Sequence, residues 1–390
     1  MPNSKLPDLV VIAMSTGTQF AVGRLYFSEW RKRLWPSLQR PATALLCLLW
    51  TLFVISIPFR FHRFYSHLVW VPFWIRGTLV ATGNIWGLAS IPSFAVYLVC
   101  RFVLRRKAAV YSPERRRLIQ TAGTVAVAAP FAAAAFGAIV ERTRFYVKET
   151  DLPIPDLHPD LEGLRIGQIS DLHVSPWLSV RDAGRAVDML NERKPNLIVV
   201  TGDVITQPGD PLDAAIRELG RLRADAGVLG CLGNHEIYCQ CENYEVAEAA
   251  KYGIDILRSR NRVLQFGNAR LNVAGVDFQS IRDGGYLKGA SGLIVPGAAN
   301  LLLSHNPDVF PAAVKQGFDA MLSGHTHGGQ VTVEILNQTL NFARFITPYV
   351  AGLYRLEGKS CYVTAGLGTI ALPVRLGAPP EISVLRLTRA

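Results

Sequence analysis

The sequence predicts an α/β domain that follows a membrane-spanning helical module. Long apolar runs with few charges occupy the first third of the chain. From Asp151 onward, short apolar segments of strand length alternate with amphipathic helix patterns and glycine-rich turns, as is typical of α/β domains. Five of the eight histidines fall in short motifs within this second part. We therefore expect two domains, a membrane module in residues 1–145 and an α/β domain in residues 146–390.

Three apolar segments predict transmembrane helices. Residues 43–58, 77–104 and 121–140 carry almost no charge, and with their flanks they approach the about 20 residues that cross a bilayer. Residues 9–22 form a further apolar stretch, which is short and contains Ser, Thr and Gln. Two alternatives stay open for this stretch, a fourth span and a segment that lies at the membrane interface.

Positively charged side chains predict how these helices are oriented. The segment before the first span and the loop between the second and third spans are both rich in Lys and Arg. These residues are Arg24, Arg31, Lys32, Arg33, Arg40, Arg101, Arg105, Arg106, Lys107, Arg115, Arg116 and Arg117. The loop between the first and second spans has only Arg60, Arg63 and Arg76. Because Lys and Arg favour the cytoplasmic side, we expect a multi-pass inner-membrane protein whose α/β domain lies on the outer side.

The charge distribution argues against a nucleic-acid partner. The formal net charge is +11, but residues 1–150 carry 19 Lys and Arg against 5 Asp and Glu, whereas residues 151–390 carry 22 against 25. The positive excess therefore belongs to the membrane module, where it sets orientation. The six cysteines are too few for a disulfide framework. Cys239 and Cys241 lack the spacing of a metal or redox pair, and we interpret them as incidental thiols.

Short apolar runs in the second part predict strands of a sheet. They cover residues 164–169, 196–200, 228–232, 271–276, 301–304 and 320–322. Residues 179–194 predict a helix between the first two strands, because Ser179 can cap it, Asp182 follows three residues later, and apolar residues form one stripe.

Polar motifs follow five of the predicted strands. In chain order they are Asp171-Leu-His173, Gly202-Asp203, Gly233-Asn234-His235-Glu236, Ser304-His305 and Gly324-His325-Thr-His327. Loops at the carboxyl edge of a sheet are where α/β folds assemble a site, so we expect the motifs to converge on one cleft. On an extended segment, residues two apart such as His325 and His327 would point to the same face.

These residue types suit the hydrolysis of a phosphate ester. Phosphoryl transfer to water needs hydroxide at neutral pH and neutralisation of the phosphoryl oxygens, which two cations about 3.5–4 Å apart supply. An aspartate that bridges both cations, surrounded by imidazole, carboxylate and amide oxygen, suits divalent transition metals such as Mn, Fe, Zn or Co. Each motif alone is common, but the ordered set predicts a two-metal site.

The ordered motifs resemble the calcineurin-like metallophosphoesterase superfamily. The wider wording ISDLHVSP, TGDVIT, LGNHE, LLSHNPD, SGHTHGGQ and GLGTIALPVRLGAPPEI is similar to its membrane-anchored branch, which includes transmembrane proteins with a metallophosphoesterase domain. The resemblance covers residues from about 145 to 390. It implies a sandwich of two mixed sheets flanked by helices, and an enzyme that hydrolyses phosphodiesters or phosphomonoesters.

The resemblance also implies roles for individual residues. Each metal would have three ligands of its own, and Asp203 would bridge the two metals. The implied sets are Asp171, His173 and His327 for one metal and Asn234, His305 and His325 for the other. His235 would stabilise the transition state and protonate the leaving oxygen, a role suited to imidazole near neutral pH. No ligand position is missing from this chain.

One segment departs from the branch. After Gly-Asn-His-Glu the chain continues IYCQCENYEVAEAA, where the branch has a glycine and an aromatic residue further on. The wall of the substrate pocket near residues 238–248 is therefore expected to differ. Gly328, Gly329 and Gln330 after the last motif are interpreted as turn formers rather than as lining of the cleft.

Two other functions are alternatives to a general phosphoesterase that acts on a phosphate ester, lipid-linked or not. One is cleavage of the pyrophosphate bond of UDP-2,3-diacylglucosamine during lipid A synthesis, which the expected outward orientation opposes because that nucleotide is made in the cytoplasm. The other is a catalytically inactive membrane scaffold, which the complete ligand set opposes.

Overall fold

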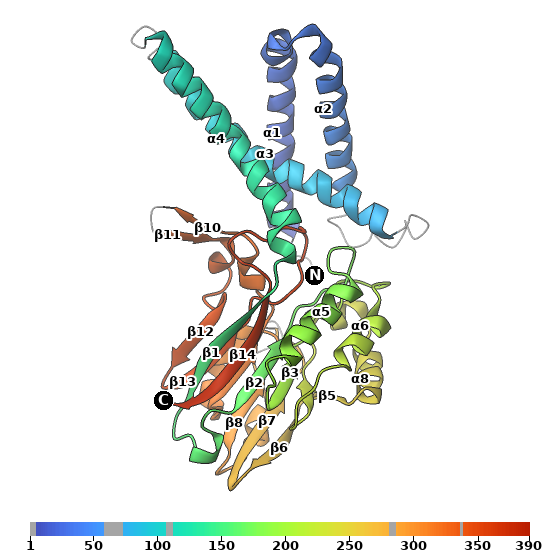
Figure 1. Cartoon of the computed structure of the whole chain (residues 1–390), viewed down its shortest axis with the longest axis vertical. Helices are drawn as coiled ribbons and strands as arrows, with labels where there is room; N and C mark the ends of the chain where they lie inside the picture. The colour runs from blue at the N-terminus through green and yellow to red at the C-terminus, as the bar shows by residue number, and fades with distance from the viewer. Residues whose placement is uncertain (1–4, 58–72, 107–111, 281–285, 336–337) are drawn as a thin grey trace. The chain divides into compact units, whose positions relative to one another are not determined.

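The computed structural model describes residues 5–57, 73–106, 112–280, 286–335 and 338–390 (Figure 1). The chain forms two compact units, Met1–Ala138 with Ala371–Pro373, and Ile139–Ile370 with Val374–Ala390. Three of the orienting cations named above, Arg60, Arg63 and Lys107, lie outside the described residues. The assignment of residues 1–145 and 146–390 to two functional domains stays a prediction.

Among the described residues, the first unit contains four long helices. They are α1 (Lys5–Leu25), α2 (Pro36–Ser56), α3 (Phe73–Arg106) and α4 (Pro113–Ile139). In the described part of the chain three helices are long and apolar enough to cross a membrane, over Pro36–Ser56, Gly77–Val103 and Arg117–Thr143. These coincide with the three spans that the sequence predicts.

The open stretch at residues 9–22 lies within α1, which does not meet the same criteria of length and hydropathy. Gln19 of α1 donates a hydrogen bond to Ser90 of α3 at 2.7 Å and accepts one from Trp86 at 2.9 Å. A buried amide in an apolar helix thus finds polar partners on its neighbour, as polar groups between membrane helices do.

The second unit contains two six-stranded sheets. Both sheets are mixed, because each combines parallel neighbours with an antiparallel pair. The first has the order β1-β14-β2-β3-β4-β5, with β1 (Tyr146–Ile154), β14 (Glu381–Arg389), β2 (Arg165–Ile169), β3 (Leu197–Val200), β4 (Val228–Gly230) and β5 (Ile254–Ile256). The second has the order β12-β13-β9-β8-β7-β6, with β12 (Gly352–Leu356), β13 (Lys359–Val363), β9 (Ala320–Ser323), β8 (Ala299–Leu303), β7 (Ala269–Gly275) and β6 (Arg260–Phe266). A separate hairpin joins β10 (Thr332–Ile335) to β11 (Gln338–Asn341).

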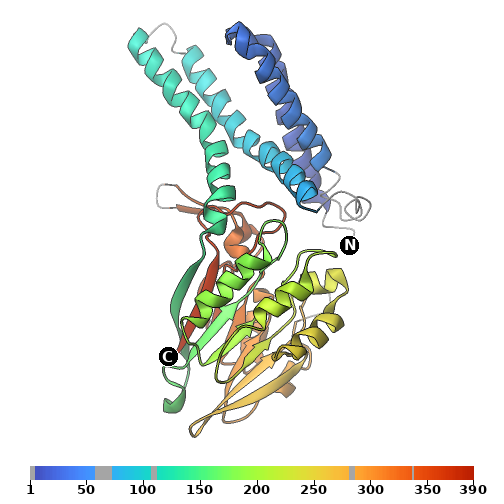
Figure 2. The ribbon, with the colours of Figure 1, turned by 45° about the vertical axis from the view of Figure 1, so that its right-hand side comes forward.

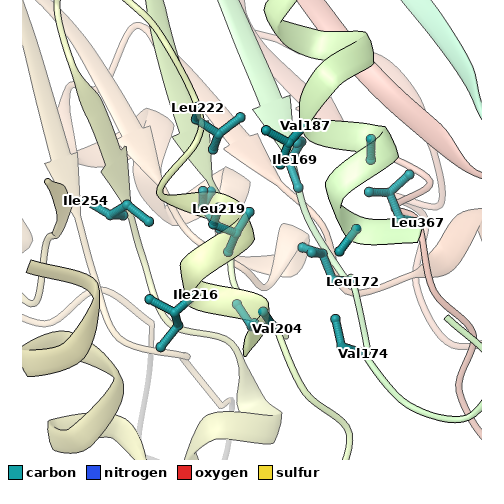
Figure 3. Close-up of a cluster of buried hydrophobic side chains, with 14 of the residues drawn as sticks. Ile169, Leu172, Val174, Val187, Val204, Ile216, Leu219, Leu222, Ile254 and Leu367 are labelled. Carbon is teal, nitrogen blue, oxygen red and sulfur yellow. The ribbon is translucent and has the colours of Figure 1, made fainter. Parts of the chain in front are cut away.

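Helices cover the outer face of the first sheet (Figure 2). They are α5 (Val180–Asn191), α6 (Leu212–Leu219), α7 (Asn234–Cys239) and α8 (Glu242–Lys251). Between these helices and the sheet lies a buried apolar cluster that includes Ile169, Val187 and Ile216 (Figure 3). A second cluster combines Ile166 and Leu197 of the first sheet with Leu271 and Leu301 of the second, and so joins the two sheets. On the other side, α9 (Phe310–Gln316) packs through Phe310 onto the second sheet.

These elements confirm the predicted fold class. Each of the six predicted strands is present, with ends that differ by at most two residues. The predicted helix is α5, where the Ser179 side chain accepts the backbone N–H of Asp182 and the Asp182 side chain accepts that of Ser179. The apolar stripe of α5 is fully buried. This packing stabilises the helix, since a helix of this length is marginal on its own. The second unit is therefore a sandwich of two mixed sheets flanked by helices.

Candidate metal centre

The five motifs meet at the carboxyl ends of parallel strands from both sheets. Asp171 and His173 follow β2, Asp203 follows β3, and Asn234 begins α7 after β4. His305 follows β8 and His325 and His327 follow β9 in the other sheet. Because β2, β3 and β4 are parallel, as are β8 and β9, their loops emerge along the same edge of the sandwich.

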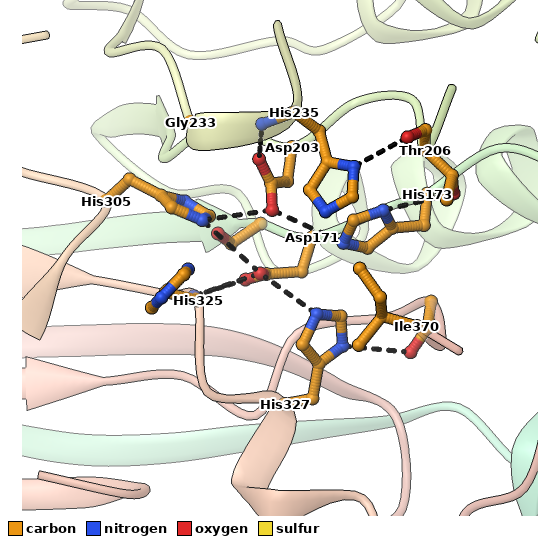
Figure 4. A network of polar contacts seen from close by, with 12 residues as sticks. Asp171, His173, Asp203, Thr206, Gly233, His235, His305, His325, His327 and Ile370 are labelled. Atoms are coloured by element: carbon orange, nitrogen blue, oxygen red, sulfur yellow. Dashed lines mark hydrogen bonds and ion pairs between the residues drawn. The ribbon is translucent and has the colours of Figure 1, made fainter. Parts of the chain in front are cut away.

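The ligand atoms form two neighbouring clusters (Figure 4). Oxygen and nitrogen atoms of Asp171, His173 and His327 lie within 4.8 Å of one another, and so do those of Asp203, His305 and His325. Asp203 lies between them, since its Oδ2 is 3.4 Å from Nε2 of His173 and 3.1 Å from Nε2 of His305. The structure thus brings together the side chains of six of the seven candidate ligands, and the seventh, Asn234, begins α7 directly after Gly233. Their roles as ligands of particular metals stay predictions.

Buried polar atoms at this point lack hydrogen-bond partners. Nε2 of His173, Nε2 of His305 and Oδ1 of Asn234 are buried and make no hydrogen bond of proper geometry among the described residues. A buried polar atom without a partner costs free energy, and a cation bound between imidazole, carboxylate and amide groups would remove that cost. The donor set therefore fits divalent metal ions.

The electrostatics of the centre depend on its two aspartates. Burial alone would raise the pKa of Asp203, but His305 and His173 outweigh burial and hold that pKa well below its usual range. Burial alone would lower the pKa of His305, but Asp203 and Asp171 raise it to about 10. Burial lowers the pKa of His325 to about 3. Without bound metal, the two aspartates thus favour the charged form of His305.

Five of the seven candidate ligands have left-handed backbone conformations. The φ angles are +51° at Asp171, +46° at His173, +56° at Asp203, +75° at His325 and +53° at His327. Residues other than glycine rarely adopt this region, at a cost of roughly 1–3 kcal/mol each, and such residues cluster at functional sites. The backbone of the centre is therefore held in place by its surroundings.

The conformation of the last motif corrects one step of the sequence argument. His325 and His327 lie on a tight turn and not on an extended segment, and they belong to different clusters. The expectation of an extended segment was wrong, because positive φ at both histidines turns the chain between them, although both side chains still reach the centre. Gly328 and Gly329 have φ of +60° and +77°, as turn formers do.

Glycines allow the loops to approach closely. A Cβ on Gly202 would lie 2.3 Å from the backbone nitrogen of Gly233, and one on Gly324 would lie 2.2 Å from Oδ2 of Asp171. Gly202 also has a φ of +86°. The loops after β2, β3, β4 and β9 therefore pack against one another at distances that only glycine permits.

Glu236 fixes two of the loops relative to each other. Its carboxylate is fully buried and accepts the backbone N–H groups of Asp203 at 3.1 Å, Val204 at 2.8 Å and Gly233 at 2.7 Å. The loop that carries Asp203 and the loop that carries Asn234 are thus tied to one carboxylate. Burial raises the pKa of Glu236, and the N–H groups of Val204 and Asp203 oppose that rise because they favour the charged form.

His235 faces the same centre. Its Nδ1 lies 2.6 Å from the backbone carbonyl oxygen of Thr206, and its ring nitrogen reaches within 4.8 Å of ligand atoms of His173 and Asp203. A carbonyl oxygen only accepts, so Nδ1 carries a proton and Nε2 is free to meet a substrate. Burial lowers the pKa of His235 to about 4. Tyr238 lies in the segment that departs from the branch, and its ring centroid is 5.5 Å from that of His235.

Four residues near the centre were not singled out as functional by the sequence argument. Thr206, besides holding His235, places its Oγ1 3.1 Å from Nδ1 of His173. Phe278 lies 5.4 Å from the ring of His325. Glu236 holds the loops after β3 and β4, and Arg375 holds the loop after β13 through the backbone carbonyls of Ala365 and Gly368. Thr206, Glu236 and Arg375 lie within the motifs quoted above, but a motif does not reveal what its residues contact. Phe278 carries no signal in the sequence, because a single aromatic residue after a strand is common.

Comparisons with known proteins agree with this geometry. A family model described as calcineurin-like phosphoesterase matches residues 164–329. The chain is 30% identical over 288 residues to "Phosphodiesterase YaeI" of Escherichia coli, covering 70% of this chain and 99% of that protein. It is 29% identical over 257 residues to "Uncharacterized metallophosphoesterase YkuE" of Bacillus subtilis, covering 64% and 86%.

A vertebrate relative also has a membrane part. The chain is 30% identical over 260 residues to a "Transmembrane protein with metallophosphoesterase domain" of Danio rerio, covering 63% of this chain and 57% of that protein. The fold and the clustered ligands define a metal-dependent phosphoesterase domain, and the three apolar helices indicate membrane association. The chain belongs to the calcineurin-like phosphoesterase family.

Proposed function

We propose that this protein is a membrane-anchored hydrolase of phosphoric ester bonds that uses two divalent transition-metal ions. The observation that carries the proposal is the position of Asp203, whose Oδ2 lies between His173 of one cluster and His305 of the other. A carboxylate in this position suits a bridging ligand. The names of the bacterial relatives, phosphodiesterase and metallophosphoesterase, support the same class of reaction.

Individual residues of the chain would bind the metal ions and transfer the proton. Asp171, His173 and His327 would hold one cation, Asn234, His305 and His325 would hold the other, and Asp203 would bridge them. When bound, the cations would neutralise the phosphoryl oxygens and lower the pKa of water. His235, oriented by the Thr206 carbonyl, would hydrogen-bond the phosphoryl group through Nε2 and deliver a proton to the leaving oxygen.

A neutral His235 is consistent with this role. Its pKa is lowered to about 4 mainly by burial, so the ring is neutral at pH 7 before substrate binds. An anionic phosphoester beside Nε2 favours the protonated form, because an opposite charge within hydrogen-bond reach raises the pKa of an imidazole. The substrate would thus bring His235 into the form that can donate.

The active site would face the outer side of the inner membrane. The support is the distribution of Lys and Arg around the three apolar helices. A reporter enzyme fused after Ala390 tests this orientation. Alkaline phosphatase, which is active outside the cytoplasm, is expected to be active in the fusion, and a fusion active only with a cytoplasmic reporter would reverse the assignment.

Hydrolysis assays test the function itself. Full-length protein, depleted of metal and reloaded with Mn, Fe, Zn or Co in turn, is expected to hydrolyse bis(4-nitrophenyl) phosphate. Asp203→Asn keeps the shape of the side chain but removes its charge, and is expected to lower activity by more than about 100-fold, since even outer partners of metal ligands contribute 10–100-fold. Unchanged activity in this variant would refute the proposal.

A further inference from the structure

The two most exposed large apolar side chains in the described part of the chain lie in the second unit, which is the catalytic unit of the proposed hydrolase. They are Phe345 at 85% and Ile346 at 86% exposure, more than any large apolar side chain described on the apolar helices. They are adjacent at the end of η11 (Phe342–Phe345), and Arg344 beside them is also exposed. An aromatic and an aliphatic residue next to a cation are typical of segments that enter a membrane interface.

Hydrogen bonds hold this tip, residues 344–346, in a fixed shape. Oδ1 of Asn341 accepts the backbone N–H of Ala343 at 2.9 Å. The N–H groups of Ile346 and Thr347 both donate to the Ala343 carbonyl at 2.9 Å, and the buried Thr347 hydroxyl pairs with Asp308 at 2.5 Å. Both ends of the tip are thus anchored, and the exposure of its apolar side chains follows from the fold.

Contacts within the catalytic unit connect the tip to the membrane exit of the chain. Glu141 lies two residues beyond the end of α4, near the end of the apolar stretch Arg117–Thr143, and its Oε1 accepts the backbone N–H of Gly377 at 2.8 Å. The preceding Leu376 accepts the N–H of Thr332 at 2.7 Å, and Thr332 pairs with Asn341 across β10 and β11. The hairpin that leads into the tip is therefore linked by a few hydrogen bonds to Glu141, near the start of the second unit.

We propose that residues 344–346 insert into the lipid interface of the same bilayer that holds the apolar helices. The catalytic unit would then touch the membrane at two places, the chain exit near Glu141 and this tip. Arg344 would meet lipid phosphate while the apolar pair enters the acyl boundary. A bilayer fits better than a protein partner because the same unit is joined to the apolar helices near Glu141, which hydrogen-bonds the segment that pairs with the hairpin.

Asn341 links the tip to the candidate metal centre. Its Nδ2 donates to the carbonyl of Gly328 at 2.9 Å, next to the candidate ligand His327. The tip and the turn that carries His327 are thus fixed to one side chain. A tip seated in the interface would hold this side of the centre close to the lipid headgroups, independently of which ester it hydrolyses.

Depth-dependent quenching tests the insertion in full-length protein reconstituted in liposomes. Phe345→Cys and Ile346→Cys are labelled with bimane and compared in ordinary and dibrominated phosphatidylcholine. The matched control is Val263→Cys on β6, an exposed apolar position at the far end of the catalytic unit from β10 and β11 (Figure 1). Parent protein labelled in the same way gives the background from native cysteines.

The expected result is a blue-shifted emission at 345 and 346 and a loss of intensity in brominated lipid that position 263 does not show. Equal quenching at all three positions would overturn the proposal. So would cross-linking of position 345 between two copies without lipid quenching, because the tip would then be a protein interface. Quenching does not depend on catalysis, so failure of the hydrolase proposal leaves this test intact.

Discussion

The backbone carbonyl of Thr206 accepts a hydrogen bond from Nδ1 of His235 at 2.6 Å. This contact fixes which ring nitrogen carries the proton and directs the other toward the candidate metal centre. The same residue contacts His173 through its hydroxyl at 3.1 Å. One short loop after β3 therefore orients a candidate ligand and the candidate proton donor, which makes both side chains dependent on its geometry.

His235→Ala is expected to lower kcat by about 10²–10⁴-fold, the usual contribution of a positioned general acid. Metal content should stay at the parent level, because His235 is outside both predicted ligand sets. Activity against bis(4-nitrophenyl) phosphate and metal analysis of the purified protein measure the two effects. The control is His158→Ala, whose side chain is half exposed. Loss of metal in His235→Ala would make His235 a ligand instead.

Thr206→Val removes the hydroxyl that contacts His173 but keeps the carbonyl that holds His235. We expect metal affinity to fall by about 10–100-fold, as when other partners of metal-ligating histidines are removed. Thr206→Ser retains the hydroxyl and should behave like the parent. Titration of metal-free protein followed by calorimetry distinguishes the two variants, and equal affinities would show that the hydroxyl does not orient His173.

Metal binding at pH 7 is expected to release at least one proton. In metal-free protein Asp203 and Asp171 outweigh burial and raise the pKa of His305 to about 10, so its ring is charged at neutral pH. An imidazole that binds a metal must be in its neutral form, and binding therefore displaces this proton. The sign follows directly: affinity should rise as pH increases from 7 toward 10, by up to about tenfold per pH unit for one proton.

Calorimetry in buffers of different ionisation enthalpy measures this release. The observed binding enthalpy should change with the buffer in proportion to the number of protons released. An enthalpy that is the same in all buffers would mean that His305 is already neutral, and the charge distribution described for the metal-free centre would be wrong.

Arg375→Met is expected to lower the thermal unfolding midpoint of the protein. Arg375 is fully buried, and its guanidinium donates only to backbone carbonyls, those of Ala365, Gly368 and Ala378, at 2.6 to 3.0 Å. Methionine fills much of the volume but removes the donor to these carbonyls, and each buried acceptor left unpaired costs about 1–3 kcal/mol. Differential scanning fluorimetry in detergent measures the shift.

The control for this variant is Arg355→Met on β12, where the side chain is exposed. Its midpoint should match that of the parent. Because Gly368 also accepts from Nδ1 of His327 at 3.3 Å, metal affinity should fall in Arg375→Met as well. An unfolding midpoint equal to that of Arg355→Met would contradict the structural role of the buried guanidinium.

A double substitution, Phe345→Ser with Ile346→Ser, should separate lipid-borne from soluble substrates. If the tip holds the centre at the interface, hydrolysis of a phosphoester lipid in vesicles falls while hydrolysis of bis(4-nitrophenyl) phosphate is unchanged. Val263→Ser serves as the exposed control. A parallel loss on both substrates would indicate damage to the centre rather than loss of membrane contact.

Particular residues show why the sequence predicted so much of the fold. The short apolar runs that end at Ile169, Val200 and Leu303 are typical of buried strands, and Ser179 with Asp182 marks the start of α5. Uncharged runs of about 20 residues match the thickness of a bilayer when they are helical, so the three apolar helices could be predicted from the sequence. These features depend only on residues that are close in the sequence, so they can be recognised without the structure.

The motifs by themselves determined which side chains gather at the carboxyl edge, because parallel strands end at a common edge. Only the tertiary structure decided how they gather. The left-handed turns at Asp171, Asp203 and His325 depend on packing between loops distant in sequence. The exposed Phe345 likewise depends on contacts of Asn341 and Thr347, which no local pattern records, because such contacts exist only once both sheets have formed.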